Sequence, residues 1–376
     1  MEIGVALALV FGLFLSYANG ANDNFKGCAT LYGSGTLSYR RSLFFSALAQ
    51  ALGSLTALLL AQGLIGAFSG KGLVPDAVVA MKSFALAVAL GTAATVMLAT
   101  RFGFPISTTH ALTGALVGSG LLASSSGVNY SKLGAGFFTP LLVSPVLALA
   151  GSSLFYLGLR FARAASGISK ETCVCVGEEV VGVLPAGMTA SQAIAAGTFP
   201  SVTVATEAVC VERYRGSFLG VGVERALDGV HVLSGAAVCF ARALNDTPKI
   251  AATLLVGGAF SPTAAILGVA VVMAVGGLVN SRRVAETMSH KVTELSPGQG
   301  LSANLVTAVL VVFASKVGLP VSTTHVSCGS LFGIGAVTGR AHGKTIAGIL
   351  LAWVTTLPLA AASSAASFLA LRHVVG

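Results

Sequence analysis

The stretch Pro105-Ile106-Ser107-Thr108-Thr109-His110 recurs as Pro320-Val321-Ser322-Thr323-Thr324-His325, and both copies lie inside apolar segments. A second polar run, Asn22-Asp23-Asn24-Phe25-Lys26, recurs as Asn245-Asp246-Thr247-Pro248-Lys249. Both motifs therefore return in the same order and at a similar distance along the chain. Because duplicated motifs at a similar period indicate a duplicated fold, we expect two similar halves.

The composition around these motifs is that of a membrane protein. Of the 376 residues, 55% are hydrophobic and only 9% are charged, and the mean hydropathy is +0.87. A soluble globular chain carries about 25% charged residues. Apolar segments long enough to cross a bilayer core of roughly 30 Å recur along the chain. The lipid bilayer is therefore the expected partner, and nucleic acid is not, since no binding motif accompanies the net charge of +9.

The predicted fold is an all-α polytopic membrane protein with two inverted-topology repeats, broken helices and about 10–12 transmembrane segments. The first and sixth segments run past about 30 residues, too long for one straight crossing at 1.5 Å per residue. Each has polar residues at its middle, so both are expected to be broken. The predicted segments cover residues 3–36, 42–66, 77–100, 104–123, 132–160, 226–258, 262–280, 301–317, 320–338 and 345–370.

Three regions follow: a first repeat over 1–161, an insert over 162–217 and a second repeat over 218–376. The first segment lacks a basic start and a convincing cleavage site, so it is expected to be retained. Placing both termini outside, in a multi-pass cell-membrane protein, puts fourteen basic residues inside and four outside, as the positive-inside rule requires. The inside set is Arg40, Arg41, Arg101, Arg160, Arg163, Lys170, Arg213, Arg215, Arg225, Arg282, Arg283, Lys291, Arg340 and Lys344; the outside set is Lys71, Lys132, Lys316 and Arg372.

The insert is then cytoplasmic, and its cysteines are expected to remain thiols in a reducing compartment. Its run Ser201–Arg213 has a strand-like pattern. Cys173, Cys175 and Cys210 offer three metal ligands without a fourth nearby, so packing within strands is the favoured interpretation over a metal site.

The Asn-Asp motifs place carboxylates inside membrane segments. An Asp at the bilayer centre costs about 2.5–3.5 kcal/mol even on lenient scales, so it needs a partner or a function. Lys26 follows Asp23 by three residues, and Lys249 follows Asp246 likewise, so each pair can share a helix face. A buried structural ion pair is one interpretation. The other is a site where Asp holds a cation and Lys an anion.

The Ser-Thr-Thr runs follow a proline, which favours the first turn of a helix. Hydroxyls cap such helix starts, and the free N–H groups there bind oxyanions. A capped, kinked helix without a ligand is the alternative. His110 and His325 are either packing residues or proton carriers, because His titrates near neutral pH.

At these motifs the chain resembles the inorganic phosphate transporter family, often called PiT. The resemblance rests on Gly20-Ala21-Asn22-Asp23, Leu244-Asn245-Asp246 and the two Pro-x-Ser-Thr-Thr-His runs, and it leaves out the insert. It implies that phosphate and its coupling cations are surrounded by the positions Asn22, Asp23, Ser107, Thr108, Thr109, Asn245, Asp246, Ser322, Thr323 and Thr324.

Lys26 and Lys249 depart from the commonest family pattern, in which small residues follow the Asp, and we add both to the predicted anion site. Some bacterial members that resemble this chain there are proton-coupled. The family also includes sulfate carriers, so the resemblance alone does not decide the substrate. Phosphate is favoured over sulfate because phosphate keeps a proton to donate to Asp23 or Asp246 and sulfate does not.

The predicted function is a secondary active symporter importing inorganic phosphate by alternating access. The coupling cation is expected at Asp23, Asp246, His110 or His325, with H+ favoured over Na+. Sodium, if used, would bind near Asn22, Asp23, Asn245 and Asp246. No cofactor and no enzyme motif is predicted. A sulfate symporter, a passive anion channel and a nutrient sensor are the alternatives, and a homodimer is compatible with the sequence.

Overall fold

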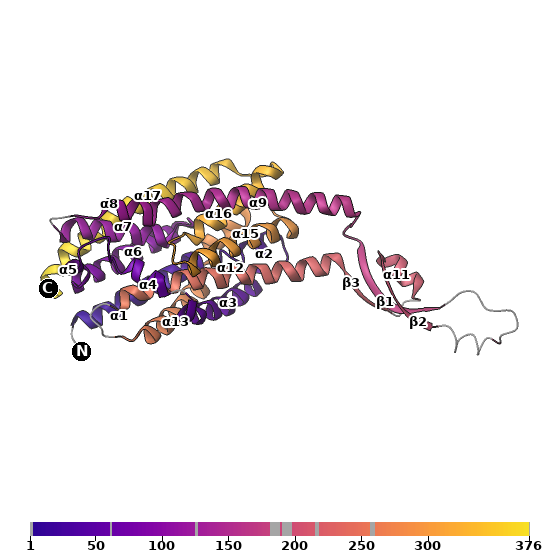
Figure 1. Ribbon diagram of the computed structural model, residues 1–376, viewed down its shortest axis with the longest axis horizontal. Coiled ribbons are helices and arrows are strands. Elements are labelled where there is room, and N and C mark those ends of the chain that lie inside the picture. Colours follow the sequence, from indigo (N-terminus) through magenta and orange to yellow (C-terminus); the bar gives the residue numbers. More distant parts are fainter. Residues whose placement is uncertain are drawn as a thin grey trace. The chain divides into compact units, whose positions relative to one another are not determined.

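The computed structural model describes residues 3–60, 62–124, 127–180, 189, 198–214, 218–255 and 260–375. The chain divides into two compact units: Met1–Tyr156 with His231–Gly376, which contains the helices of both repeats (Figure 1), and Leu157–Val230.

The first repeat consists of α-helices and one π-helical turn. Their bounds are α1 (Ile3–Asp23), α2 (Ala29–Gly33), α3 (Tyr39–Leu60), α4 (Gln62–Phe68), α5 (Asp76–Val79), α6 (Lys82–Phe102), α7 (Thr108–Ala123), α8 (Tyr130–Leu133), η1 (Gly134–Phe138) and α9 (Thr139–Ser166).

The second repeat begins with a long helix that leaves the insert. Its bounds are α12 (Val223–Leu254), α13 (Pro262–Asn280), α14 (Arg282–Glu286), η3 (Thr287–Lys291), α15 (Pro297–Lys316), α16 (Thr323–Thr338) and α17 (Gly343–Val375). Within the described residues, eight helical stretches are long and apolar enough to cross a membrane. Helices α7 and α16, of 16 residues each, are shorter than these eight stretches and begin at the Ser-Thr-Thr motifs.

Helices α1 and α12 run antiparallel through the centre of the membrane unit. A methyl group added at Gly12 of α1 would lie 2.3 Å from a side-chain carbon of Leu254, and one at Gly27, in the turn after α1, would lie 2.5 Å from the sulfur of Cys239. Earlier residues of the first segment thus contact later residues of α12, as they do when two helices are antiparallel. Since α1 and α12 carry the duplicated Asn-Asp motif, the two repeats are inverted relative to each other.

Glycines pack helices of one repeat against those of the other. A methyl at Gly53 of α3 would lie 2.2 Å from the carbonyl oxygen of Phe240 on α12, and one at Gly276 of α13 would lie 2.1 Å from that of Tyr17 on α1. Gly53 and Gly276 occupy equivalent positions of the two repeats, because they are separated in sequence by as many residues as Asp23 and Asp246. The packing is therefore duplicated together with the motif, and it depends on the absence of a Cβ atom.

Two helical hairpins carry the Ser-Thr-Thr motifs. Helix α6 ends before Gly103 and α15 ends before Gly318, and both glycines adopt left-handed backbone angles, with φ of 75° and 69°. The amide of Phe104 donates to Ala99 at 3.0 Å, and the amide of Leu319 donates to Ala314 at 2.9 Å. These bonds form the same C-cap at each tip. The chain then runs without helix to Ser107 or Ser322, where the next helix begins.

The predicted helix breaks differ between the repeats. The first segment is broken: turns at Asn24–Cys28 separate α1 from α2. The sixth segment is one continuous helix, α12, with Pro248 inside it, so the break expected there is absent. Gly27 supports the first turn because it approaches Cys239 and Gly235 closely. Its counterpart in the second repeat is the buried Ile250, which is compatible with a continuing helix.

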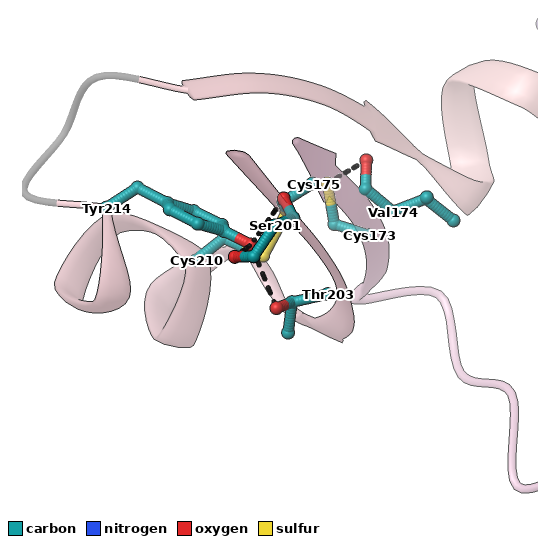
Figure 2. The surroundings of a disulfide bond; sticks show 7 residues. All are labelled: Cys173, Val174, Cys175, Ser201, Thr203, Cys210 and Tyr214. Atoms are coloured by element: carbon teal, nitrogen blue, oxygen red, sulfur yellow. Dashed lines mark hydrogen bonds between the residues drawn. A yellow bond between two sulfur atoms is a disulfide. The ribbon is translucent and has the colours of Figure 1, made fainter. Parts of the chain in front are cut away.

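The second unit contains a small antiparallel sheet of order β2-β1-β3, built from β1 (Thr172–Val180), β2 (Thr198–Thr206) and β3 (Phe218–Gly222). The predicted strand-like run is a strand only to Thr206. Its remainder forms helix α11 (Glu207–Arg213), whose acidic first residue favours a helix start. The structure also differs from the expected three thiols, because Cys175 and Cys210 form a disulfide while Cys173 stays free (Figure 2).

Candidate functional site

The four motifs meet at one buried polar centre of the membrane unit. Asp23 at the end of α1 and Asp246 in the last third of α12 lie there with Lys26 and Lys249, and each of these residues is at most 3% exposed. The tips of the α6–α7 and α15–α16 hairpins complete the centre. Buried ionisable groups persist in a protein only when they are paired and hydrogen-bonded, and all four of these groups are.

The Lys26 ammonium is bound by four oxygens. It donates to Asn22 Oδ1 at 3.1 Å and to the carbonyl of Ile106 at 2.9 Å, and it also donates to the hydroxyl of Thr324 and to Asp23. Three of these partners belong to the first repeat and one to the second. Hard cations prefer oxygen ligands of this kind: a carboxylate, an amide, a carbonyl and a hydroxyl oxygen around one centre. Here an ammonium group occupies it.

Lys249 has the corresponding surroundings in the other repeat. It donates to the hydroxyl of Thr109 at 2.8 Å and to the carbonyl of Val321 at 2.9 Å, and its ion pair with Asp246 measures 3.6 Å. Each lysine therefore binds a carbonyl at the tip of its own repeat and a hydroxyl from the other repeat. The charged centre thus has the same two-fold relation as the helices.

The third hydroxyls of the two motifs also donate across the repeats. Thr324 donates to the carbonyl of Ile106 at 2.7 Å, and Thr109 donates to that of Val321 at 3.1 Å. Because these carbonyls also accept from the lysines, the two hairpin tips are held to each other and to α1 and α12. An anion that enters must replace some of these bonds.

Asn19 connects the two carboxylates and was missed by the sequence analysis. Its Nδ2 lies 3.2 Å from Asp23 Oδ2, 3.4 Å from Asp246 Oδ2 and 3.0 Å from the hydroxyl of Thr108. Thr108 in turn lies 3.3 Å from Asp23. Asn19 stands one turn before Asp23, and its polar side chain in an apolar helix was the available signal.

Arg242 is a third buried cation that the sequence analysis also missed. Its guanidinium donates to Asn19 Oδ1 at 3.1 Å and to Asn24 Oδ1 at 3.2 Å, and it lies 3.9 Å from Asp246 Oδ2. It precedes Asp246 by one helical turn. Two carboxylates and three cations give the centre a formal charge of +1, where the motifs alone give zero.

Asn22 and Asn245 hold the hairpins in place. Asn22 donates to Thr100 at 2.9 Å and to the carbonyl of Phe104 at 3.0 Å. Asn245 donates to the carbonyl of Val321 at 3.2 Å and accepts from Ser315 at 3.2 Å. The asparagine next to each Asp therefore positions the tip that supplies the hydroxyls.

Ser107 and Ser322 are N-caps, as the motif predicts. Ser107 Oγ accepts from the amide of His110 at 3.0 Å, and Ser322 Oγ accepts from that of His325 at 3.1 Å. Thr323 is buried in the first turn of α16. Two helix starts thus point at one centre, and their free N–H groups favour an anion there.

The two histidines lie against each other with ring centroids 4.2 Å apart. His325 also stacks on Trp353 at 3.7 Å, and the indole donates to the carbonyl of Pro105 at 3.2 Å. His325 Nε2 is buried without a hydrogen-bond partner in the described part of the chain. The pair therefore packs behind the hairpin tips, and its role in proton transfer stays a prediction.

Inverted repeats of membrane helices around a buried, charged centre are an architecture that many transporters share. Residues 19–364 match the family model described as the phosphate transporter family, and the chain belongs to that family. It is 27% identical to an inorganic phosphate transporter of Arabidopsis thaliana, named chloroplastic, over 94% of this chain and 70% of the relative.

The fold is also that of a solved structure described as the sodium-dependent phosphate transporter. The TM-score is 0.73, and the similarity covers 99% of each chain at 21% sequence identity. The prediction of the family and of the membrane fold is thereby confirmed.

Proposed function

We propose that this protein imports inorganic phosphate by alternating access, and that protons rather than Na+ are the coupling ions. The observation that carries the coupling proposal is the Lys26 ammonium, which uses the oxygens of Asn22, Asp23, Ile106 and Thr324. A sodium ion would need such oxygens. In the second repeat the Lys249 ammonium likewise uses a hydroxyl and a carbonyl oxygen, those of Thr109 and Val321.

The formal charge favours phosphate that carries protons. A centre with Asp23 and Asp246 against Lys26, Lys249 and Arg242 is neutralised by one monovalent anion. Dihydrogen phosphate meets that condition and brings its protons with it. Charge imbalance is costly where the dielectric constant is low, so no additional metal cation is needed. Sulfate is a dianion without a proton to donate to either carboxylate.

Two cavities lie next to residues that contact the centre. One of about 330 Å³ is lined by Phe68, whose ring lies 5.4 Å from the Lys249 ammonium. The other, of about 660 Å³, is lined by Thr100, the partner of Asn22, and by Arg101 and Arg283. We take these as the two mouths, with the arginine-lined cavity facing the cytoplasm by the positive-inside rule.

The start of α1 and the end of α17 lie together and, in the proposed orientation, outside. A methyl at Gly4 would lie 3.9 Å from a side-chain carbon of Val375.

The sodium dependence in the name of the solved neighbour does not carry over at 21% identity.

The test is uptake of labelled phosphate into proteoliposomes that contain the full-length protein. We expect saturable uptake under an inward proton gradient without Na+, no stimulation by an inward Na+ gradient at equal pH, and weak inhibition by excess sulfate. Strict dependence on Na+ would refute the coupling. Sulfate uptake undiminished by phosphate would refute the substrate, and flux without saturation would indicate a channel.

A further inference from the structure

The second unit brings three cysteine sulfurs of the insert together. Cys173 and Cys175 stand two residues apart on β1, so their side chains share one face of the sheet. Helix α11 lies against that face and supplies Cys210 (Figure 2). The three sulfurs lie within 4.8 Å of one another, and all three residues are buried.

The contact between α11 and the sheet does not depend on the disulfide alone. Tyr214 follows Cys210 by one helical turn, and its hydroxyl lies 2.9 Å from Thr203 Oγ1 and 3.0 Å from Ser201 Oγ on β2 (Figure 2). Its ring packs with the cysteines in one small apolar cluster. Reduction of the disulfide therefore leaves the three thiols close together.

We propose that the reduced trio Cys173, Cys175 and Cys210 binds one soft, thiophilic metal ion through three thiolates. The Cys175–Cys210 disulfide is the alternative, oxidised form of the same site. Metal–thiolate bonds are about 2.3 Å long, so three ligands around one ion lie roughly 4 Å apart. The observed grouping needs only side-chain rotation to reach that spacing.

The ligand set selects the class of ion. Between residues 157 and 230 the sequence contains no histidine and no other cysteine. Structural zinc sites are almost always tetrahedral, with four ligands, whereas thiolates alone select soft ions such as Cu(I). A buried three-sulfur site thus suits an ion that accepts three ligands.

Oxidation and metal binding exclude each other. A low-molecular-weight disulfide oxidises the Cys175 and Cys210 thiols to the protein disulfide and is itself reduced to two thiols. The protons and the electron pair pass to the released thiols, and Cys173 is left as a single sulfur ligand. In the cytoplasmic orientation the reduced, metal-binding form predominates.

The experiment uses full-length protein in which the membrane cysteines are replaced, as Cys28→Ala, Cys239→Ala and Cys328→Ala. Cu(I) is titrated anaerobically in competition with a chromophoric Cu(I) chelator. We expect one Cu(I) per chain after reduction, no binding after treatment with glutathione disulfide, and recovery on renewed reduction. Excess Zn(II) should not displace the Cu(I).

The decisive variant is Cys173→Ser on the same background, because it keeps both partners of the disulfide. It should form the disulfide as before, measured by thiol alkylation and mass, yet lose the tight Cu(I) site. Cys210→Ser should lose both the disulfide and the tight Cu(I) site. A monodisperse elution profile and phosphate uptake would show that each variant is folded. Absence of Cu(I) binding by the reduced background protein, or unchanged binding by Cys173→Ser, would overturn the proposal.

Discussion

The ammonium of Lys249 donates to the hydroxyl of Thr109, 2.8 Å away, although the two residues belong to opposite repeats. The reciprocal bond joins Lys26 to Thr324. These bonds keep the two hairpin tips against the two central helices. Opening of the site toward either side must lengthen one of them, so the lysines are expected to contribute both to the anion site and to the closed state.

Replacement of a lysine should change the coupling ion. In Lys26→Ala the oxygens of Asn22, Asp23 and Ile106 lose their cation, and Na+ can take its place. We expect phosphate uptake to fall in the absence of Na+ and to be partly restored by an inward Na+ gradient. Uptake in proteoliposomes at fixed pH measures this. Normal transport by both Lys26→Ala and Lys249→Ala, without a Na+ effect, would show that neither lysine sets the coupling.

The hydroxyls at the hairpin tips should contribute to phosphate affinity. Thr108→Val removes a donor near Asp23, and Thr109→Val removes an acceptor of the Lys249 ammonium. Loss of a buried hydrogen bond to a charged group costs roughly 1.5–3 kcal/mol, or about 10- to 100-fold in affinity. Thr323→Val, the buried position in the other tip, should act in the same direction.

Thr113→Val is the matched control for these variants. Thr113 is equally buried and lies one turn further along α7, but its hydroxyl donates to the backbone of Thr109 within the same helix. Its phosphate affinity should remain near that of the wild type. If Thr108→Val and Thr323→Val bound phosphate as tightly as this control, the hydroxyls would be structural only.

Arg242 should set the charge of the empty centre. Arg242→Gln lowers the formal charge from +1 to zero, so binding of a monovalent anion is expected to weaken. Arg242→Lys keeps the charge but reaches fewer acceptors, and it should restore part of the affinity. The phosphate KM measures the change in affinity, and the transport current in supported membranes measures the change in charge. A Gln variant that is folded and has unchanged KM and current would exclude Arg242 from the site.

Much of the centre was predictable because its residues form recognisable repeats. The Asn-Asp and Ser-Thr-Thr motifs, and the lysine three residues after each Asp, were identified from the sequence and lie together in the structure. Asn19 and Arg242 were missed because they occupy equivalent positions of the two repeats, one turn before each Asp, but differ in residue type. A search for duplicated motifs does not select a pair of positions at which the repeats have diverged.

The remaining differences have local causes. The continuous α12 was not predicted, because polar residues at the middle of a segment too long for one straight crossing indicated a break, whereas the turn around Pro248 is buried and remains helical. The valines after Thr206 predicted a strand, but in the structure α11 packs Cys210 and Tyr214 on the sheet at a helical spacing. Only tertiary contacts decide such short segments.

Close helix packing gives a prediction about stability. A methyl at Gly276 would lie 2.1 Å from the carbonyl of Tyr17, whereas Gly268 on the same helix has its nearest neighbour at 4.0 Å. Gly276→Ala should therefore destabilise the protein by about 1–3 kcal/mol, the usual cost of overpacking. Gly268→Ala should be neutral or slightly stabilising because Ala favours a helix. Thermal unfolding in detergent compares them, and equal melting temperatures would contradict the packing.

The last prediction concerns the orientation in the membrane. Ala135 and Gly343 are both exposed and lie at opposite faces in the proposed topology, the first outside and the second in the cytoplasm. On a background in which all six natural cysteines are replaced by alanine, Ala135→Cys should react with a membrane-impermeant maleimide on intact cells. Gly343→Cys should react only after the membrane is permeabilised. The expectation rests on the fourteen basic residues that this orientation places inside. The opposite labelling pattern would place the insert outside the cell, in a compartment where the Cys175–Cys210 disulfide is the stable form and the reduced metal site does not occur.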